Sequence, residues 1–172
     1  MMDVNGLISA AFQLFNEKKY AEAIEKLHQA WDGITDKSIQ ITEQSWIQSG
    51  LGRCYFEQAI KTKDTDKADE LFGKAVKHYQ EWSRLAKTDG QNSIQQQINA
   101  QSWLGRCFLE QARRIKDADK ADKRFGQAVK CYEEWLQLAK QLTDEQGSVQ
   151  QQINAQSWLG RCSLEQAMKT KG

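Results

Sequence analysis

Four cysteines and two histidines are the residues of this sequence that could supply thiolate or imidazole groups to a zinc site or to a nucleophile–base pair: Cys54, Cys107, Cys131, Cys162, His28 and His78. A zinc site needs three or four thiolate or imidazole ligands held close together, and no Cys-x-x-Cys pair occurs here. A nucleophilic thiol needs a neighbouring base, and the sequence places none beside a cysteine. We therefore expect no metal site and no cofactor. The repeated Cys54, Cys107 and Cys162 are expected to be small, reduced residues of the core.

Signatures of catalysis are also missing from the sequence. It has no GxGxxG, no Walker loop, no HExxH and no GxSxG motif. The two histidines lack a partner that would orient a catalytic base, and we expect both at helix surfaces. The sequence therefore predicts no enzymatic activity and no catalytic residue.

Composition favours long helices and a protein partner. The 172 residues include no proline and 11 glycines, and good helix formers dominate. The 24 basic and 23 acidic residues give a net charge of +1, without the basic excess of a nucleic-acid binder. No apolar run is long enough to cross a bilayer, and Asp3 stands where a signal peptide would carry positive charge. We therefore expect a cytoplasmic protein that binds neither nucleic acid nor membrane.

Internal duplication is the dominant signal in the chain. Residues 95–112 and 150–167 differ only at Phe108 and Ser163, and residues 51–59 hold a weaker copy. A second block begins at Lys63 and recurs at Lys116. The copies are 53 to 55 residues apart, which is typical of a repeat protein.

Both blocks have the apolar spacing of amphipathic helices. Polar turns separate them: an Asp of the KDTD and KDAD segments is expected to cap the following helix, and Ser93 and Ser148 are expected to cap theirs. The sequence predicts a single domain, residues 1–172, with hairpins at about 4–34, 38–87 and 93–142 and an unpaired or capping helix at 148–169. Its helices are expected at roughly 4–16, 20–34, 38–62, 66–87, 93–115, 119–142 and 148–169.

The first hairpin resembles a tetratricopeptide repeat, with residues of the expected types at Leu7, Ala10, Ala11, Leu14, Tyr20, Ala23, Leu27 and Ala30. Later units keep similar anchors, such as Leu104-Gly105 with Phe108 and Ala128 with Tyr132. The resemblance spans the whole chain and implies an all-α fold, an α-α superhelix (solenoid) of about seven antiparallel helices. Small residues let such helices approach closely, and a larger aromatic side chain fills the neighbouring gap.

Two departures from the family pattern are expected to change the geometry. The later units contain about eleven residues more than the 34 of the family, which is close to three helical turns and lengthens both helices without rotating their apolar faces. Trp82 and Trp135 stand where the family prefers alanine, and their rings are expected to alter the packing of neighbouring pairs.

The resemblance also implies a binding surface, since first-type helices of this family line a concave groove that holds a peptide or protein. The matching positions in this sequence are Arg53, Glu57, Asn99, Ser102, Arg106, Glu110, Asn154, Ser157, Arg161 and Glu165. Arginine with asparagine suits an anionic or extended peptide, because arginine forms forked hydrogen bonds and asparagine pairs with backbone amides.

Structural explanations exist for the same residues. Arg106 and Glu110 are four residues apart, which favours an ion pair within one helix. The run at 95–97 and its copy at 150–152 are three glutamines each, suited to a solvated helix face or to polar contacts between neighbours. Trp103 and Trp158 are expected in the core between repeats rather than as peptide anchors.

The function predicted from the sequence is a protein-interaction scaffold. Two alternatives stay open: a regulatory module of a longer protein with a separate effector domain, and a structural repeat that assembles with itself. The last helix has no second-type partner in the sequence, so it is expected either to cap the array or to precede further repeats. Its unpaired face is a candidate for self-association.

Overall fold

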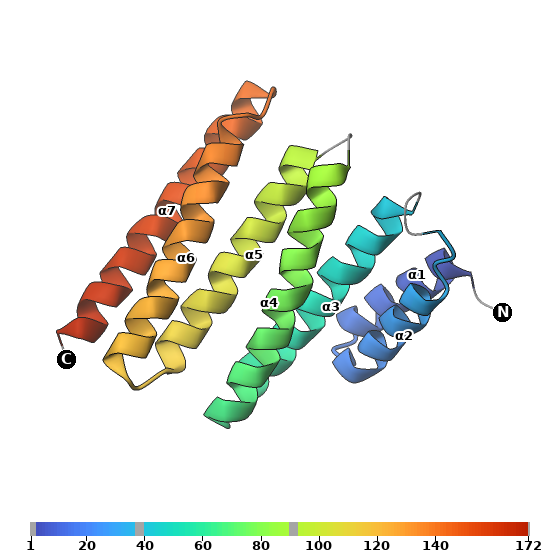
Figure 1. Ribbon diagram of the computed structural model, residues 1–172, viewed down its shortest axis with the longest axis horizontal. Coiled ribbons are helices and arrows are strands. Elements are labelled where there is room, and N and C mark those ends of the chain that lie inside the picture. The colour runs from blue at the N-terminus through green and yellow to red at the C-terminus, as the bar shows by residue number, and fades with distance from the viewer. Residues whose placement is uncertain (1–2, 37–39, 90–92, 172) are drawn as a thin grey trace. The chain divides into compact units, whose positions relative to one another are not determined.

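The chain folds into helices, and the described residues 3–36, 40–89 and 93–171 contain no strand. In the computed structural model, the seven helices are α1 (Val4–Asn16), α2 (Tyr20–Asp32), α3 (Ile41–Lys61), α4 (Thr65–Thr88), α5 (Ser93–Arg114), α6 (Ala118–Ala139) and α7 (Glu145–Thr170) (Figure 1). Within the described residues, none of them has a stretch both long and apolar enough to pass through a lipid bilayer. The all-α class predicted from the sequence is confirmed.

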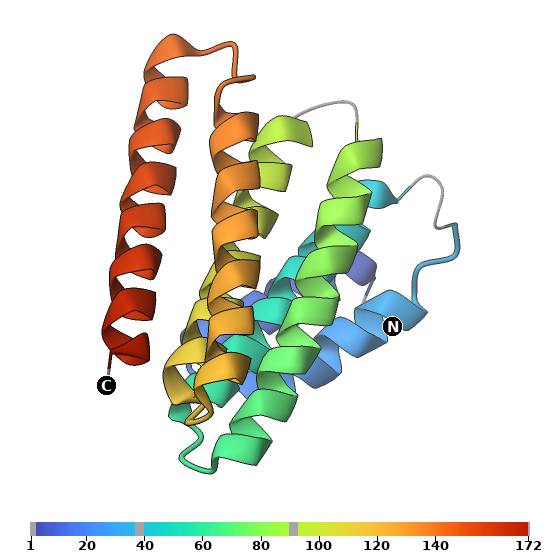
Figure 2. The same cartoon turned by 60° about the vertical axis from the view of Figure 1, so that its left-hand side comes forward.

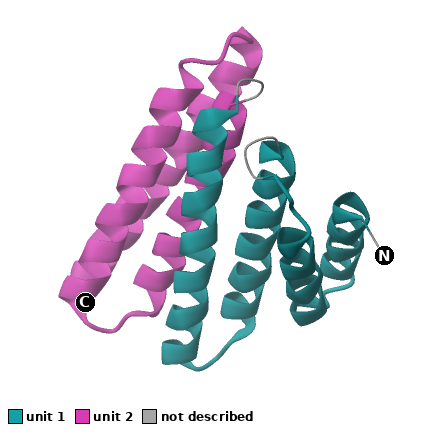
Figure 3. Ribbon diagram, turned by 45° about the vertical axis from the view of Figure 1, so that its right-hand side comes forward, with its two compact units in different colours: residues 1–91 teal, residues 92–172 magenta. Residues whose placement is uncertain are grey.

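Two compact units divide the chain, Met1–Gln91 and Asn92–Gly172 (Figure 3). Unit 1 holds α1 to α4, and α1 packs on α2, α2 on α3 and α3 on α4. Unit 2 holds α5 to α7, and α6 packs against both of its neighbours. Consecutive helices therefore form the interfaces of each unit, as expected of helix pairs joined by short turns.

The helices after the first hairpin are long, as the extra residues predict. The helices α1 and α2 have 13 residues each, whereas α3 to α7 have between 21 and 26. Most predicted ends lie within three residues of the observed ones. The predicted start of the third helix, at residue 38, lies outside the described residues.

Aspartate side chains fix where several helices begin. Asp64 and Asp117 accept hydrogen bonds from the backbone N–H groups of Lys67 and Lys120, so the predicted caps of the KDTD and KDAD turns are confirmed. The predicted cap at Ser148 is wrong, because Asp144 caps α7 one turn earlier. The Ser148 hydroxyl instead donates to the Ala139 carbonyl at 2.7 Å, which satisfies an acceptor at the end of α6.

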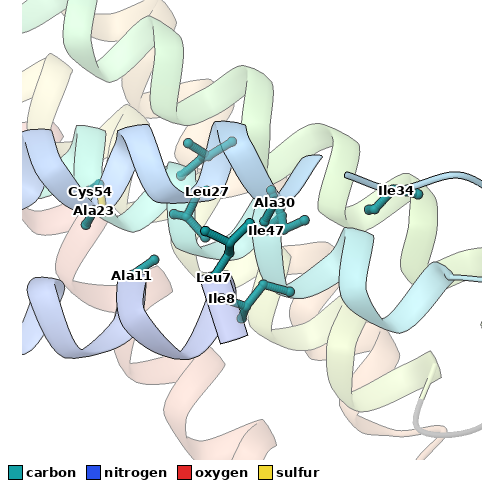
Figure 4. Close-up of a cluster of buried hydrophobic side chains, with 10 residues drawn as sticks. Leu7, Ile8, Ala11, Ala23, Leu27, Ala30, Ile34, Ile47 and Cys54 are labelled. Atoms are coloured by element: carbon teal, nitrogen blue, oxygen red, sulfur yellow. The ribbon is translucent and has the colours of Figure 1, made fainter. Parts of the chain in front are cut away.

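Unit 1 has a core in which the first hairpin packs against α3. Leucine, isoleucine and alanine side chains from α1 and α2 meet Ile47, Leu51 and Cys54 of α3 (Figure 4). Alanines such as Ala23 and Ala30 are fully buried, so the helices approach closely at those positions. These are positions at which the sequence resembles a tetratricopeptide repeat.

A tyrosine seated on a glycine is the contact shared by both long hairpins. A Cβ atom added to Gly52 of α3 would lie 2.5 Å from a ring carbon of Tyr79 of α4. Gly105 of α5 is covered in the same way by Tyr132 of α6. Both rings are fully buried. The helices can approach this closely only because residues 52 and 105 lack a side chain.

We predict that Gly105→Ala lowers the free energy of unfolding by about 1–3 kcal/mol, because its methyl group overlaps the Tyr132 ring in a filled core. Urea denaturation followed by circular dichroism measures the change. Gly126→Ala is the matched control, since no heavy atom lies within 4 Å of its added Cβ and alanine favours helix by up to about 1 kcal/mol. Equal stabilities of the two variants would contradict the packing argument.

Candidate functional site

Aromatic and guanidinium groups alternate where α5 and α7 meet in unit 2. The Arg106 guanidinium lies 4.5 Å from the centre of the Trp103 ring on its own helix and 5.9 Å from that of Trp158 on α7. Arg161 lies 5.3 Å from the Trp158 ring. An arginine near an aromatic ring is held by attraction to the ring electrons, so each guanidinium is oriented before any ligand arrives.

An ion-pair network adjoins these rings and joins the same two helices. The Arg113 Nε and Nη2 atoms each donate to a different carboxylate oxygen of Glu165, both at 2.6 Å, and Nη1 donates to Glu110. Arg161 donates to Glu165 through Nε at 3.2 Å. The hydrogen bonds from Arg113 hold the pKa of the Glu165 carboxyl below its ordinary value. Glu165 therefore fixes one arginine from each helix.

Lys169 adds a second bond between α7 and α5. Its ammonium donates to the carbonyl oxygens of Ala112 and Arg113 at 2.7 and 2.9 Å. A cation there satisfies acceptors at the carboxyl end of α5 and complements the helix dipole. Together with the Arg113–Glu165 pair, this contact sets the position of α7 along α5.

Two asparagines of the predicted groove occupy equivalent places on α5 and α7. The side-chain carbonyl of Asn99 accepts from Gln95 at 3.0 Å, and that of Asn154 accepts from Gln150 at 3.1 Å. Neither Nδ2 group donates to another described residue. Each asparagine is thus held by its oxygen and retains two N–H donors for an acceptor such as a peptide carbonyl.

The structure brings together most of the predicted groove residues of unit 2. Arg106, Glu110, Arg161 and Glu165 belong to the surface just described, and Ser157 is exposed on α7. Ser102 turns its hydroxyl to the Asn99 carbonyl at 2.8 Å. The predicted ion pair at a four-residue spacing forms between Arg161 and Glu165, whereas Glu110 pairs with Arg113.

The predicted residues of unit 1 have a different setting. Arg53 on α3 lies 4.5 Å from the Phe15 ring centre and lines a small apolar pocket with Phe12 and Leu27. The side chain of Arg53 is therefore part of the packing between α1, α2 and α3. Glu57 is half-buried on the same helix. The contacts between arginines and tryptophans on α5 and α7 lie within unit 2.

Arg113 and Lys169 contribute to the site although the sequence pattern did not single them out. Their partners lie more than fifty positions away in the chain, at Glu165 and Ala112. No spacing within one helix indicates such a contact. The duplicated segments end at Ala112 and Ala167, and the position equivalent to Arg113 is Met168, so the duplication does not indicate these contacts either.

The glutamine run of α7 (150–152) makes one polar contact with a neighbouring helix, while its first residue, Gln150, is exposed. Gln151 accepts a hydrogen bond from the Trp135 indole of α6 at 3.0 Å, and Gln152 donates to Ser148 at 3.1 Å. The Trp158 ring stacks on Tyr132 of α6 with centroids 5.8 Å apart. The expectation that Trp158 packs between repeats is therefore confirmed, and its ring also carries Arg161.

The thiols are buried and held in the neutral form. Cys54, Cys107 and Cys162 are buried, as predicted, and burial raises the pKa of Cys54 to about 12 and that of Cys162 to about 11. A neutral thiol is a poor nucleophile and a poor metal ligand. Among the described residues, no three or more Cys, His, Asp or Glu side chains form a group that could hold a metal ion.

His78 is partly buried, which lies between the surface position that the sequence predicts and a core position. Its ring stacks on Tyr55 at 5.5 Å, and its Nδ1 lies 2.7 Å from the Gln48 side-chain oxygen. Burial, with help from His28 and Lys77, lowers the pKa of His78 to about 4. His28 is exposed, as predicted. In the second long hairpin, Phe108 and Cys131 occupy the places of Tyr55 and His78.

We predict that stability falls as the pH drops from about 6.5 towards 4, because the unfolded chain protonates His78 there and the folded chain resists it. The loss is on the order of 1–3 kcal/mol. Urea denaturation at pH 7, 5.5 and 4.5 measures it. His78→Cys, which copies the residue of the second hairpin, should flatten this dependence, and His28→Gln should leave it nearly unchanged. The same slope in wild type and His78→Cys would refute the assignment.

We also predict that Glu165→Gln destabilises the protein by about 1 kcal/mol at pH 7, because it removes the acceptor of two charge-assisted bonds. The pKa of Glu165 is lowered in the folded state, so this stabilisation is present above the ordinary carboxyl pKa and is lost as the pH falls through the folded value. The free energies of unfolding of the wild type and of Glu165→Gln should therefore become equal at acidic pH. Arg161→Gln is the control: its side chain is 58% exposed, and we expect a smaller effect.

Neither a family model nor a curated protein matches this sequence.

Proposed function

We propose that this chain is a protein-interaction scaffold whose unit 2 binds an extended acidic peptide across α5 and α7. The observation that carries the proposal is the state of Arg161. Its Nε bonds to Glu165 and its guanidinium carbon lies 5.3 Å from the centre of the Trp158 ring, while its two terminal nitrogens bond to no described residue. A half-exposed guanidinium held in this way presents a fork of donors that matches a carboxylate.

The neighbouring groups suit a peptide more than a small anion. Asn154 and Asn99 offer N–H donors one turn or more from the arginines, and such donors pair with the carbonyls of an extended backbone. Trp103 and Trp158 add half-buried aromatic surface of the kind found at the centre of interfaces. Backbone capture with a carboxylate anchor is the chemistry that these residues share.

We also propose that the helices form a superhelix of the tetratricopeptide type. The packing of consecutive helices and the tyrosine-on-glycine contact support a tetratricopeptide-like superhelix, in which first-type helices carry the binding surface. Four free cysteines are typical of a reducing compartment, so we place the role in the cytoplasm. The role is one of binding, with no chemistry performed on the partner.

The test is an array of extended peptides with graded acidic content, probed with the full chain and followed by calorimetry on the best binder. We predict that Arg161→Glu weakens binding about tenfold or more, because it replaces the anchoring cation by a repelling charge. Arg161→Lys should recover only part of the loss, since lysine lacks the fork.

Arg84→Glu on α4 is the matched control, because Arg84 is similarly exposed and also pairs with a glutamate of its own helix. It makes the same change in net charge outside unit 2. Equal losses of peptide affinity in Arg84→Glu and Arg161→Glu would show that binding depends only on the net charge of the chain. A peptide that binds Arg161→Glu as tightly as it binds the wild type would rule out the proposed surface.

A further inference from the structure

The side of α7 that faces away from α6 repeats a surface that is covered elsewhere in this chain. Ile153, Gly160 and Leu164 of α7 correspond to Ile98, Gly105 and Leu109 of α5. At about 100° per residue, each set lies within about 40° around its helix. The two helices therefore carry the same apolar strip.

The two strips differ sharply in burial. Ile98 and Leu109 are each 1% exposed, whereas Ile153 is 54% and Leu164 is 62% exposed. Val149 and Met168 extend the exposed strip towards the two ends of α7. Isolated exposed apolar residues are ordinary, but a continuous strip along one helix indicates a surface for association.

The glycine in each strip shows what the covering group is. The Tyr132 ring of α6 occupies the space at Gly105, and the Tyr79 ring of α4 occupies the space at Gly52. At Gly160 no heavy atom lies within 4 Å of an added Cβ. Figure 2 shows α7 at the edge of unit 2, with α6 on one side and no described helix of the unit on the other.

We propose that the strip of Val149, Ile153, Gly160, Leu164 and Met168 is a docking site for a helix of the α4 and α6 type, whose tyrosine seats on Gly160. Both helices of this type carry the same pattern: Phe72, Ala75, Tyr79 and Trp82 in α4, and Phe125, Ala128, Tyr132 and Trp135 in α6. The chain thus contains one example of this strip with its partner, α5 with α6, and a second pair, α3 with α4, that shares the tyrosine-on-glycine contact.

A second copy of α7 fits the strip less well. The open space beside Gly160, where no side chain projects, is called the notch here. Two such strips face to face would leave this notch empty, because neither strip contains an aromatic ring. Trp158 of α7 is stacked on Tyr132 on another side of the helix. A helix that brings a tyrosine fills the notch and buries the apolar side chains at once.

The docking strip borders the surface proposed to bind a peptide at Met168, which lines a surface hollow with Arg113, Glu165 and Lys169. Arg161 and Glu165 lie between the strip and the α6-facing side of α7, where Ala155 and Cys162 are fully buried. The inference does not rest on the proposed function, and a failure of one leaves the other standing.

The probe is a fluorescent peptide of residues 116–142, which contains α6 and its capping Asp117, added to the full chain under reducing conditions. We expect saturable binding by fluorescence anisotropy and a gain of helical circular dichroism. The same peptide with Tyr132→Ala should bind about tenfold more weakly, because it leaves the notch at Gly160 unfilled.

Gly160→Ala in the full chain tests the same contact from the side of α7. It should weaken binding of the wild-type peptide about tenfold or more, because its methyl group takes the place of the tyrosine ring. It should fold normally with an unchanged or slightly higher Tm, by about 2–4 °C, since alanine favours helix and nothing lies near its Cβ. The matched control is Gly126→Ala, an equally open helical glycine on α6, which should bind as the wild type does.

Three results would overturn the proposal. The first is the absence of saturable binding. The second is equal binding by wild type and Gly160→Ala, which would indicate exchange with the chain's own α6. The third is a concentration-dependent dimer in light scattering that the peptide does not dissociate, which would assign the strip to a second copy of α7.

Discussion

Unit 2 depends on one side chain, Tyr132 of α6, which is packed between α5 and α7. Its ring covers Gly105 on one side and stacks on Trp158 on the other. Burial raises the pKa of its hydroxyl, which bonds to no described residue. A buried hydroxyl without a partner is unfavourable, so the contribution of the ring to packing must exceed that penalty. The position of α7, and hence of Arg161, follows from this contact.

The sequence predicted the all-α class and the positions of the helices well, because these signals are local or duplicated. Helix periodicity and the KDTD and KDAD turns located the helices, and the glycine beside an apolar run indicated a close approach of helices. The error at Ser148 has a physical cause. Asp144 is the better cap because its carboxylate accepts from Gly147 at 2.8 Å, and this extra turn carries Ser148 into the interface with α6.

The candidate site was only partly predictable, because its main contacts join distant parts of the chain. The four-residue spacing of Arg161 and Glu165 is visible in the sequence, and that pair forms. The Arg113–Glu165 pair and the Lys169 contact depend on how α7 lies along α5. The partial burial of His78 was missed for the same reason: its partners Tyr55 and Gln48 lie on another helix, and helical periodicity does not report such partners.

Duplication explains why nearly identical segments have different surroundings. The segments 95–112 and 150–167 differ at one residue, yet Leu109 is buried and Leu164 is exposed. The one difference follows the same logic: Phe108 is buried in α5, and a serine stands at the exposed position 163 of α7. The Tyr132 ring of α6 covers Gly105 in the strip of α5, whereas no heavy atom lies within 4 Å of a Cβ added at Gly160 of α7. The same apolar side chains are therefore buried in one copy and exposed in the other, which is the pattern of a surface that a partner covers.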